Sequence, residues 1–406
     1  MKIENLSGLS LENVFRRDDF GIYIHVPFCM RRCRYCAFVS STPREVPEQA
    51  YVQALLNEFA LRYPEFAAFS LKTLYFGGGT PTMLSDAAIG KIVDTITKVC
   101  GTPLEISLEL NPEHVTPQRC ASWKSLGFTR ISLGIQSFDQ EMLAFLGRRH
   151  DAVKSLAAID MLHHAGVDEI SIDLIYGGRP DEAISDDLAV SRWRRELETA
   201  KSCALAHASC YELTLEPHTP LWTLEKRGHP VLCTDEAIAE MMAMIPDGLG
   251  MTRYEVSNYS RNDFYSAHNL GCWAGISYLG LGVAAHSLCT GHRRFVRQAN
   301  TKNIKQYLAS LHAGVPVCPK PEFVETLSSQ VHLAERLICA ARTQLWFDPY
   351  DVADQIGADL KPFLPCIDKA VRNEWMESGR DGRLRTTNNG IRLNNLLDSV
   401  LFEGCE

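Results

Sequence analysis

Between residues 21 and 213 the chain alternates short runs of β-branched, aromatic and aliphatic residues with longer segments of helical periodicity. Helices are predicted between the runs, over about 48–63, 86–99, 151–165 and 184–200, and Thr116-Pro117 is typical of a further helix start. Because strands joined through helices pair in parallel, this order predicts a parallel sheet in an α/β fold. The predicted strands are Gly21–Val26, Leu71–Phe76, Leu104–Leu110, Arg130–Ile135, Ile170–Tyr176 and Ser209–Leu213. Six strands are fewer than the eight of a closed TIM barrel, so we expect a partial, open TIM-type βα barrel.

Four segments are expected along the chain. They are an N-terminal segment at 1–20, the barrel at 21–232, a less regular connecting region at 233–321 and a small C-terminal domain at 322–406. The last is predicted to contain helices at about 328–343, 349–356 and 361–378, a β-like pair formed by Leu384–Thr386 and Gly390–Leu393, and a helix at 394–402. This winged-helix-like α+β pattern has no basic recognition helix, so we expect it to pack or to bind a protein rather than DNA.

Composition and charge restrict the compartment and the partners. The 406 residues carry a net charge of −8 with both signs mixed, whereas a dedicated nucleic-acid binder normally has a basic patch. The first 20 residues lack the apolar core of a signal peptide, and no apolar run reaches about 18 residues. We therefore expect a soluble, cytoplasmic protein that does not bind nucleic acid.

Three of the 14 cysteines, Cys29, Cys33 and Cys36, are crowded into a C-x3-C-x2-C loop after the first predicted strand. Each thiolate can bind a different iron of a [4Fe–4S] cluster, and because full ligation takes four cysteines, three leave one iron open to another ligand. Neighbouring arginines lower thiolate pKa values and offset the negative charge of a cluster. The alternative is a zinc site, but zinc usually takes a second pair of ligands at short spacing and none lies nearby. Most of the other eleven cysteines are expected to be small buried side chains.

The cysteine loop, the aromatic residue that follows it and the glycine-rich turn Gly77–Pro81 after the second strand together resemble the radical S-adenosylmethionine (SAM) superfamily. Physically, glycines let the backbone approach a ligand closely and offer it amide groups. The resemblance implies a [4Fe–4S] cluster whose open iron binds the amino and carboxylate groups of SAM, with one-electron cleavage of a carbon–sulfur bond of SAM.

Further motifs narrow the resemblance to the oxygen-independent coproporphyrinogen III oxidase group: YIHVPFC from Tyr23, GGGTPT from Gly77, ELNP from Glu109, GIQSF from Gly134 and IDLIYG from Ile172. The residues that match this group's SAM-contacting positions are Tyr23, Tyr35, Gly78, Gly79, Thr80, Glu109, Gln136, Arg148 and Asp173. Carboxylates and an amide suit hydroxyl and amino groups, and an arginine suits a carboxylate. Each of three residues has a structural alternative to SAM binding: Glu109 could be a surface residue at a strand end, Gln136 a turn cap and Arg148 part of a solvated basic run. Asp173 lies inside an apolar strand, where a buried carboxylate needs a partner.

This group has two branches with different functions. The chain departs from the pattern of the oxidase branch in two features, which favours the other branch. The oxidases carry a further cysteine two positions after the last cluster cysteine and a long N-terminal extension; here Phe38 occupies that position and the N-terminal segment is short. The resemblance therefore points to the heme chaperone (HemW) branch, which carries a His-Asn-x-x-Tyr-Trp motif. In this chain the motif starts at His268 and has Cys272 in place of its tyrosine.

His268 is the candidate heme ligand, since imidazole is a common axial ligand of heme iron, and His286 is a second candidate. The alternative is a histidine that is simply hydrogen-bonded in an irregular region. The resemblance implies heme or another tetrapyrrole as a ligand, heme-accepting proteins as partners, and a one-electron donor such as a flavodoxin or ferredoxin. The alternative function is the oxidative decarboxylation of coproporphyrinogen III to protoporphyrinogen IX, as an enzyme.

Overall fold

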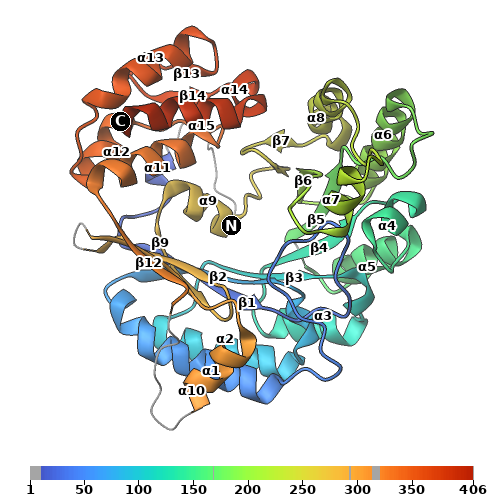
Figure 1. Ribbon diagram of the computed structural model, residues 1–406. Helices are drawn as coiled ribbons and strands as arrows, with labels where there is room; N and C mark the ends of the chain where they lie inside the picture. The colour runs from blue at the N-terminus through green and yellow to red at the C-terminus, as the bar shows by residue number, and fades with distance from the viewer. Residues whose placement is uncertain (1–10, 168, 292–293, 313–320, 406) are drawn as a thin grey trace.

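A computed structural model describes residues 11–167, 169–291, 294–312 and 321–405 (Figure 1). A sheet of twelve strands curves through most of this part of the chain. Its centre is the parallel series of six strands that the sequence predicts: β1 (Asp19–Val26), β2 (Ser70–Gly78), β3 (Glu105–Leu110), β4 (Arg130–Gln136), β5 (Glu169–Tyr176) and β6 (His207–Glu212). The prediction of an open α/β barrel is therefore confirmed, since the edge strands of the sheet are not paired with each other among the described residues.

The sheet is wider than predicted, because strands of the connecting region extend both of its edges. On one side β9 (Ser277–Leu281) runs parallel to β1, followed by the antiparallel strands β10 (His286–Cys289), β11 (Phe295–Ala299) and β12 (Phe323–Leu327). On the other side lie β8 (Asn258–Ser260) and β7 (Thr252–Arg253). The large sheet thus includes a strand beyond residue 322, where the sequence places the start of the last segment.

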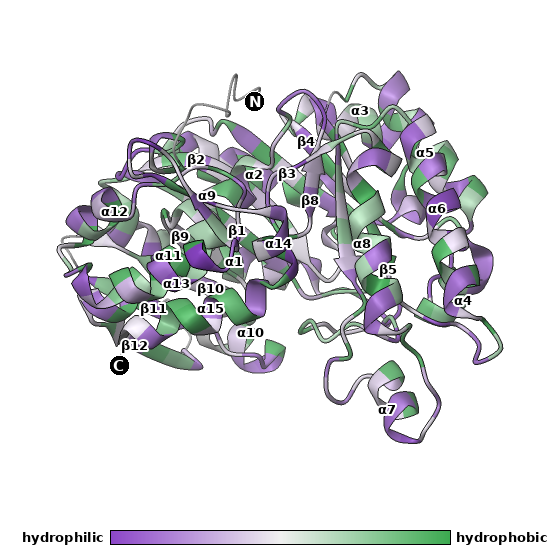
Figure 2. Ribbon diagram, turned by 90° about the horizontal axis from the view of Figure 1, so that it is seen from above, coloured by the Kyte–Doolittle hydropathy of each residue, from purple (hydrophilic) through white to green (hydrophobic). Residues whose placement is uncertain are grey.

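Helices cover the convex face of the sheet, and their apolar sides pack on it. In chain order they are α1 (Glu48–Arg62), α2 (Asp86–Cys100), α3 (Pro117–Ser125), α5 (Ala152–His164) and α6 (Asp186–Ser202), with α8 (Asp235–Leu249) beside α6 and α10 (Ile304–His312) beside α1. Two short helices, α4 (Gln140–Leu146) and α7 (Pro220–Lys226), were not predicted, because seven residues are too few for a helical pattern to stand out. Figure 2 shows hydrophilic and hydrophobic residues mixed along α4, α5 and α6, as expected of helices with one side in water.

One helix lies on the concave side of the sheet. This is α9 (Ala267–Ala274), which contacts β1 and β2 and begins over the interior of the barrel (Figure 1). The buried carboxylate of Glu105 accepts hydrogen bonds from the amides of Ala267 (2.9 Å) and His268 (3.1 Å). Glu105 is itself held by Arg130 at 3.2 Å. A carboxylate at a helix N-terminus satisfies unpaired amides there, so this buried ion pair anchors α9 inside the barrel.

The C-terminal part forms a second core of its own. It contains α11 (Ser329–Ala341), α12 (Pro349–Ile356), α13 (Leu364–Arg372), β13 (Met376–Ser378), β14 (Leu384–Thr386), α14 (Asn388–Arg392) and α15 (Asn394–Phe402). The prediction of a strand at Gly390–Leu393 is wrong, because β14 pairs instead with β13, inside the segment predicted as a helix to Ser378. Gly390 lies in α14, where a β-carbon would be 2.0 Å from the Trp375 carbonyl oxygen, so this glycine serves close packing.

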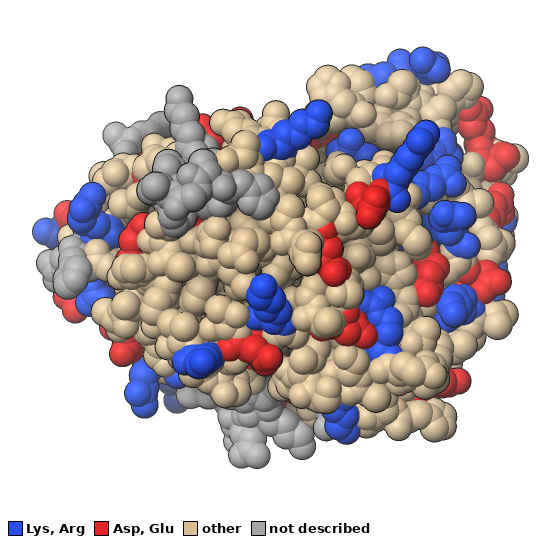
Figure 3. Space-filling view, turned by 90° about the horizontal axis from the view of Figure 1, so that it is seen from below, with Lys and Arg blue, Asp and Glu red and all other residues tan. Residues whose placement is uncertain are grey.

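Two observations bear on the partners of the protein. No helix in the described ranges combines the length and the hydropathy needed to cross a bilayer. The face shown in Figure 3 carries basic and acidic side chains interspersed, in agreement with the mixed charge of the sequence.

Candidate functional site

A cavity of about 380 Å³ opens at the carboxyl ends of the parallel strands. Its lining brings together most of the residues predicted to bind the cluster and SAM, from the ends of four strands, the cysteine loop and the segment between α4 and α5. These are Cys29, Cys33, Tyr35, Cys36, Gly78, Gly79, Thr80, Glu109, Gln136, Arg148 and Asp173. Ligands of open parallel sheets bind at this end of the strands, and residues distant in sequence meet here because every strand ends at the same edge.

The cysteine loop packs directly against the glycine turn. A β-carbon on Gly79 would lie 2.8 Å from the Phe28 carbonyl oxygen and 3.0 Å from the Cys29 sulfur, so only glycine fits. Gly78 adopts a φ of +106°, which side chains disfavour. Thr80 completes the contact, since its amide donates to the Phe28 carbonyl at 2.8 Å and its hydroxyl to the Cys29 sulfur at 3.8 Å. The turn therefore presents bare backbone next to the cysteine loop, as a cradle for a small ligand requires.

Arg148 is not a solvated member of a basic run but is part of this cavity. Its guanidinium donates to the Cys33 sulfur at 3.4 Å, to the Asn111 side-chain oxygen at 2.6 Å and to the Gly134 carbonyl at 2.5 Å. Asn111 in turn donates to the Thr80 hydroxyl at 3.2 Å. The sequence analysis did not single out Asn111, although a polar residue next to Pro112, just past the end of β3, is a detectable signal at such an edge. Together these contacts place a fixed positive charge beside the cysteines.

Two carboxyl groups face the same cavity from neighbouring strands. Glu109 accepts from the Tyr75 hydroxyl at 2.6 Å and from the Gly78 amide at 3.3 Å, and Asp173 accepts from the Ser132 hydroxyl at 3.3 Å. Burial and the nearby Asp173 together raise the pKa of Glu109 to about 7, against the effect of the hydrogen bonds from Tyr75 and Gly78. Burial likewise raises the pKa of Asp173 to about 6. Carboxyl groups poised near neutrality are suited to receive a ligand that carries an amino group or a sulfonium.

Gln136 occupies a strained position at the end of β4. Its φ is +70°, which a non-glycine residue rarely adopts, and the register between β4 and β5 shifts between Gly134 and Gln136. Bulges often redirect a side chain next to a functional site, and this one directs Gln136 into the cavity lining rather than into a turn cap.

These raised pKa values predict a pH dependence of stability. The folded state holds Glu109 and Asp173 protonated at pH values where the unfolded chain ionises them, so their contribution is fully present below about pH 4 and is lost as the pH rises through about 6 to 7. We expect Glu109→Gln to reduce the fall in unfolding free energy between about pH 5 and pH 8, measured by urea denaturation. The exposed Glu141→Gln serves as the control. A pH profile of Glu109→Gln that parallels the unchanged protein contradicts the assignment.

Tyr23 and His268 are the predicted site residues that lie outside this cavity. Both line a second pocket of about 550 Å³. Tyr23 supports the glycine turn from behind: a β-carbon on Gly77 would lie 3.0 Å from the Tyr23 ring. Tyr23 also contacts His25 Nδ1 at 3.1 Å, and the His25 ring fills the space where Gly78 would carry a side chain. Ala37 and Phe38 line both cavities, so this short stretch of the cysteine loop separates them.

His268 is held at the inner end of the second pocket. Its Nδ1 lies 2.8 Å from the Thr73 hydroxyl, and its ring stacks on Tyr75 with centroids 4.7 Å apart. A β-carbon on Gly21 would be 2.7 Å from the Thr73 hydroxyl oxygen, so the glycine leaves room for this partner of the ring. Burial lowers the pKa of His268 to about 4, which keeps the imidazole neutral. When Nδ1 carries the proton and donates to Thr73, Nε2 presents a lone pair, the form in which histidine binds a metal.

The segment around His268 is the regular helix α9, not irregular chain. Cys272, four residues on, is one turn away on the same side of the helix and its side chain is exposed toward the second pocket. His286 also lines the pocket and packs edge-to-face on Phe323, with ring centroids 5.6 Å apart. The structure thus brings the two candidate heme ligands, His268 and His286, to one pocket together with Cys272 of the motif.

Comparisons with known proteins identify the family of the chain. The model of the radical SAM superfamily matches residues 23–188. The heme chaperone HemW of Escherichia coli is 30% identical over 395 residues, covering 94% of this chain and 98% of that protein. HemW of Mycobacterium tuberculosis is 33% identical over 327 residues (79% and 80%), and HemW of Synechocystis is 32% identical over 412 residues (95% and 96%).

A solved structure extends the similarity to the whole fold. Coproporphyrinogen III oxidase (HemN) from Escherichia coli, a radical SAM enzyme, superposes with a TM-score of 0.77 at 19% identity, covering 96% of this chain and 92% of that one. At this identity the likeness concerns the fold alone, whereas the identity to the HemW proteins over most of both chains decides the family. The chain is a member of the radical SAM superfamily and, within it, of the heme chaperone HemW family.

Proposed function

We propose that this protein binds heme in the pocket around His268 and passes it to heme proteins, while a [4Fe–4S] cluster and SAM occupy the adjoining cavity. The observation that carries the proposal is the setting of His268: a neutral, oriented imidazole at the inner end of a pocket of about 550 Å³. The HemW relatives, which are heme chaperones by name, support the same function.

The lining of the pocket suits the chemistry of a heme. Heme is a broad apolar ring with two carboxylates on one edge, and the pocket offers aromatic and aliphatic surface from Tyr23, Phe38, Tyr278 and Ala284. Lys302, an exposed residue in the same lining, supplies a cation for a carboxylate. His268 then binds the iron through Nε2, and Thr73 keeps the ring oriented, as hydrogen-bonded partners of metal-binding histidines generally do.

In the adjoining cavity Cys29, Cys33 and Cys36 would bind three irons of the cluster. The glycine turn and Thr80 would receive the amino-acid part of SAM, with Glu109, Gln136, Asp173, Tyr35 and Arg148 as further contacts. One-electron chemistry is what a cluster and SAM supply together when they are bound. The part of the protein is to orient SAM through these side chains, to balance the charge of the thiolates with Arg148 and to limit access of water.

Two exposed side chains of the cluster loop support a proposal about the electron donor. Arg31 and Arg32 are exposed at the mouth of the cavity, next to Cys29 and Cys33. Exposed Glu212 and Glu216 line the same cavity, so the positive charge is confined to the cluster loop. Two arginines on this loop attract an acidic protein, so a flavodoxin or a ferredoxin is the class of partner that we propose for reduction of the cluster.

Titration of heme into the anaerobically reconstituted protein tests the proposal. We expect a saturable shift of the Soret band near one heme per chain, lost in His268→Ala. Thr73→Val, which removes only the partner of Nδ1, is expected to weaken binding by about ten- to a hundredfold. His163→Ala, on the exposed side of α5, is the matched control and should bind normally.

The outcomes separate the two functions that the sequence leaves open. A shift that is indifferent to His268→Ala removes this residue from the site. A protein that does not bind heme at all contradicts the chaperone proposal, and turnover of coproporphyrinogen III then tests the alternative, an oxidative decarboxylase.

A further inference from the structure

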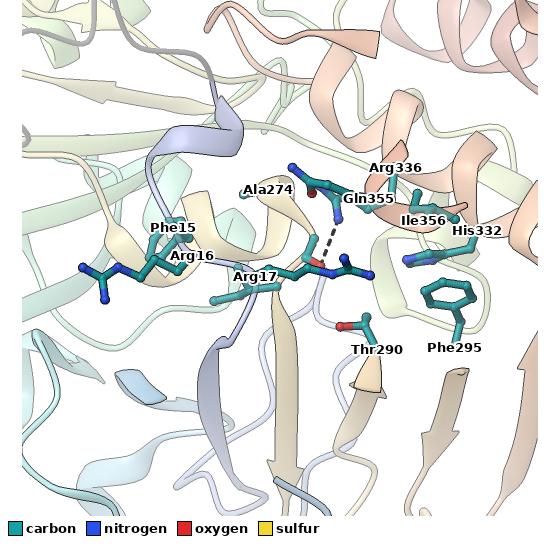
Figure 4. Close-up of a pocket in the computed structure, with 12 residues that line it drawn as sticks. Phe15, Arg16, Arg17, Ala274, Thr290, Phe295, His332, Arg336, Gln355 and Ile356 are labelled. Carbon is teal, nitrogen blue, oxygen red and sulfur yellow. Dashed lines mark hydrogen bonds between the residues drawn. The ribbon is translucent and has the colours of Figure 1, made fainter. Parts of the chain in front are cut away.

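A third pocket, of about 50 Å³, lies where the N-terminal segment, the end of α9 and the C-terminal helices meet (Figure 4). It shares no lining residue with the two cavities described above. Arg16, Arg17 and Arg336 are among the residues that line it, and none of its described lining residues is acidic. A pocket that gathers several positive side chains favours an anion as its occupant.

His332, on α11, adds a buried polar group that lacks a partner. It is 1% exposed, and its ring stacks on Phe295 with centroids 4.0 Å apart. Its Nδ1 has no hydrogen-bond partner in the described part of the chain. Burial, together with the charges of Arg336 and Arg297, lowers the pKa of His332 to about 3, so the ring is neutral and carries one N–H. In the tautomer that carries the proton on Nδ1, a ligand that accepts this hydrogen bond would satisfy a group that is costly to leave unpaired in a buried position.

The two arginines that face the space come from opposite ends of the chain. The side chain of Arg336 packs on Gly275, since a β-carbon on Gly275 would be 2.2 Å from the Cδ of Arg336. Arg336 also donates a hydrogen bond to the Gly275 carbonyl at 3.3 Å. Arg17 is exposed and extends into the space between Arg336 and Thr290, and the His332 ring points toward it from the other side (Figure 4). The side chain of Arg16 turns away from this group.

The geometry points to a binding site for a phosphate group, which we propose is held by Arg17, Arg336 and His332. Donors approach from three directions, which suits the several oxygens of a tetrahedral phosphate better than the two oxygens of a planar carboxylate. A water molecule needs about 10–15 Å³ of such cavity volume. The pocket of about 50 Å³ therefore has room for one phosphate group and not for a nucleotide. The ligand is therefore inorganic phosphate or the terminal group of a phosphate monoester whose remainder stays in solvent.

The position of this site gives it a structural consequence. A bound phosphate would connect the segment before β1, the C-terminal end of α9 and helix α11. Helix α9 begins with His268, so occupancy of the site would restrain the helix that carries the proposed heme ligand. The proposal itself does not depend on heme binding, because its residues and its test are separate.

Thermal unfolding of the full chain in phosphate, against chloride at equal ionic strength, tests the site. A ligand that binds only the folded state raises the melting temperature with its concentration until the site is filled and logarithmically beyond. Phosphate also stabilises proteins through exclusion from their surface, so the comparison of variants is what decides. Arg17→Gln removes an exposed arginine that faces the pocket, and Arg16→Gln removes its neighbour that turns away, which makes them a matched pair.

We expect phosphate to bind the unchanged protein and Arg16→Gln alike, and Arg17→Gln at least about tenfold more weakly, since a charge-assisted hydrogen bond is lost. His332→Phe keeps the ring on Phe295 but removes the N–H, and should weaken binding in the same direction. Equal responses of Arg16→Gln and Arg17→Gln would mean general surface stabilisation and overturn the site. Methyl phosphate distinguishes the two sources: an affinity like that of inorganic phosphate indicates a monoester site, and no response indicates a site for the free anion.

Discussion

Cys33→Ser is expected to lower the iron content of the anaerobically reconstituted protein to background and to abolish SAM binding, and Cys29→Ser and Cys36→Ser should do the same. With three protein ligands for four irons, removal of one leaves two irons without a protein thiolate. Cys33 has a further role in the structure, because its sulfur accepts a hydrogen bond from Arg148. Iron and sulfide per chain, the visible absorption of the cluster and equilibrium binding of SAM measure the effect.

Cys203→Ser is the matched control for the cluster experiment. Cys203 is half-buried and donates from its sulfur to the Thr199 carbonyl at 3.3 Å, a contact that serine can also make. This variant should hold a full complement of iron. If Cys33→Ser retained a stable four-iron cluster, the assignment of the three cysteines as its ligands would be wrong.

Glu105→Gln is expected to destabilise the protein by about 3–5 kcal/mol, as the loss of one partner from a buried ion pair does. Glu105 is fully buried and joins Arg130 to the amides of Ala267 and His268. The substitution leaves Arg130 with only the more distant carboxylate of Glu169, at 3.8 Å, and weakens the anchor of α9. Urea denaturation followed by circular dichroism measures the change.

The pH dependence of the same variant gives a second readout. Burial by itself would raise the pKa of Glu105, but Arg130 and the two amides lower it below its usual value. The contribution of Glu105 is therefore present above the unfolded pKa and is lost as the pH falls through the folded pKa. Glu105→Gln should remove this part of the acid sensitivity.

Glu141→Gln again provides the control, because Glu141 pairs with Arg192 at 2.7 Å on the surface, where ion pairs contribute about 0–1 kcal/mol. A loss of stability in Glu105→Gln no larger than in Glu141→Gln would mean that the buried pair does not anchor α9.

The barrel could be predicted from local patterns because each of its strands is short, apolar and followed by a helix. By contrast, β9 was not predicted as a strand of the barrel. Its five residues include Gly280, and it becomes a strand through pairing with β1, more than 250 residues earlier in the chain. Likewise, Gly390–Leu393 has a local β pattern, but the close packing of Gly390 on Trp375 places it in a helix. Local propensity fails where distant contacts provide the larger part of the stabilisation.

The functional sites, too, could be predicted from the sequence only in part. The spacing of Cys29, Cys33 and Cys36 and the polar residues at the strand ends determined the first cavity from the sequence, because parallel strands bring their carboxyl ends to one edge. Only the tertiary structure placed Tyr23 in the other pocket, added Asn111 to the first cavity, and set His268 against Thr73 across a separation of 195 residues. It also brought Arg17 and Arg336 from opposite ends of the chain to one small pocket. Spacing along the chain encodes a ligand set that one loop can hold, whereas a pocket formed by distant segments depends on how the whole sheet curves and on which helix fills its concave side.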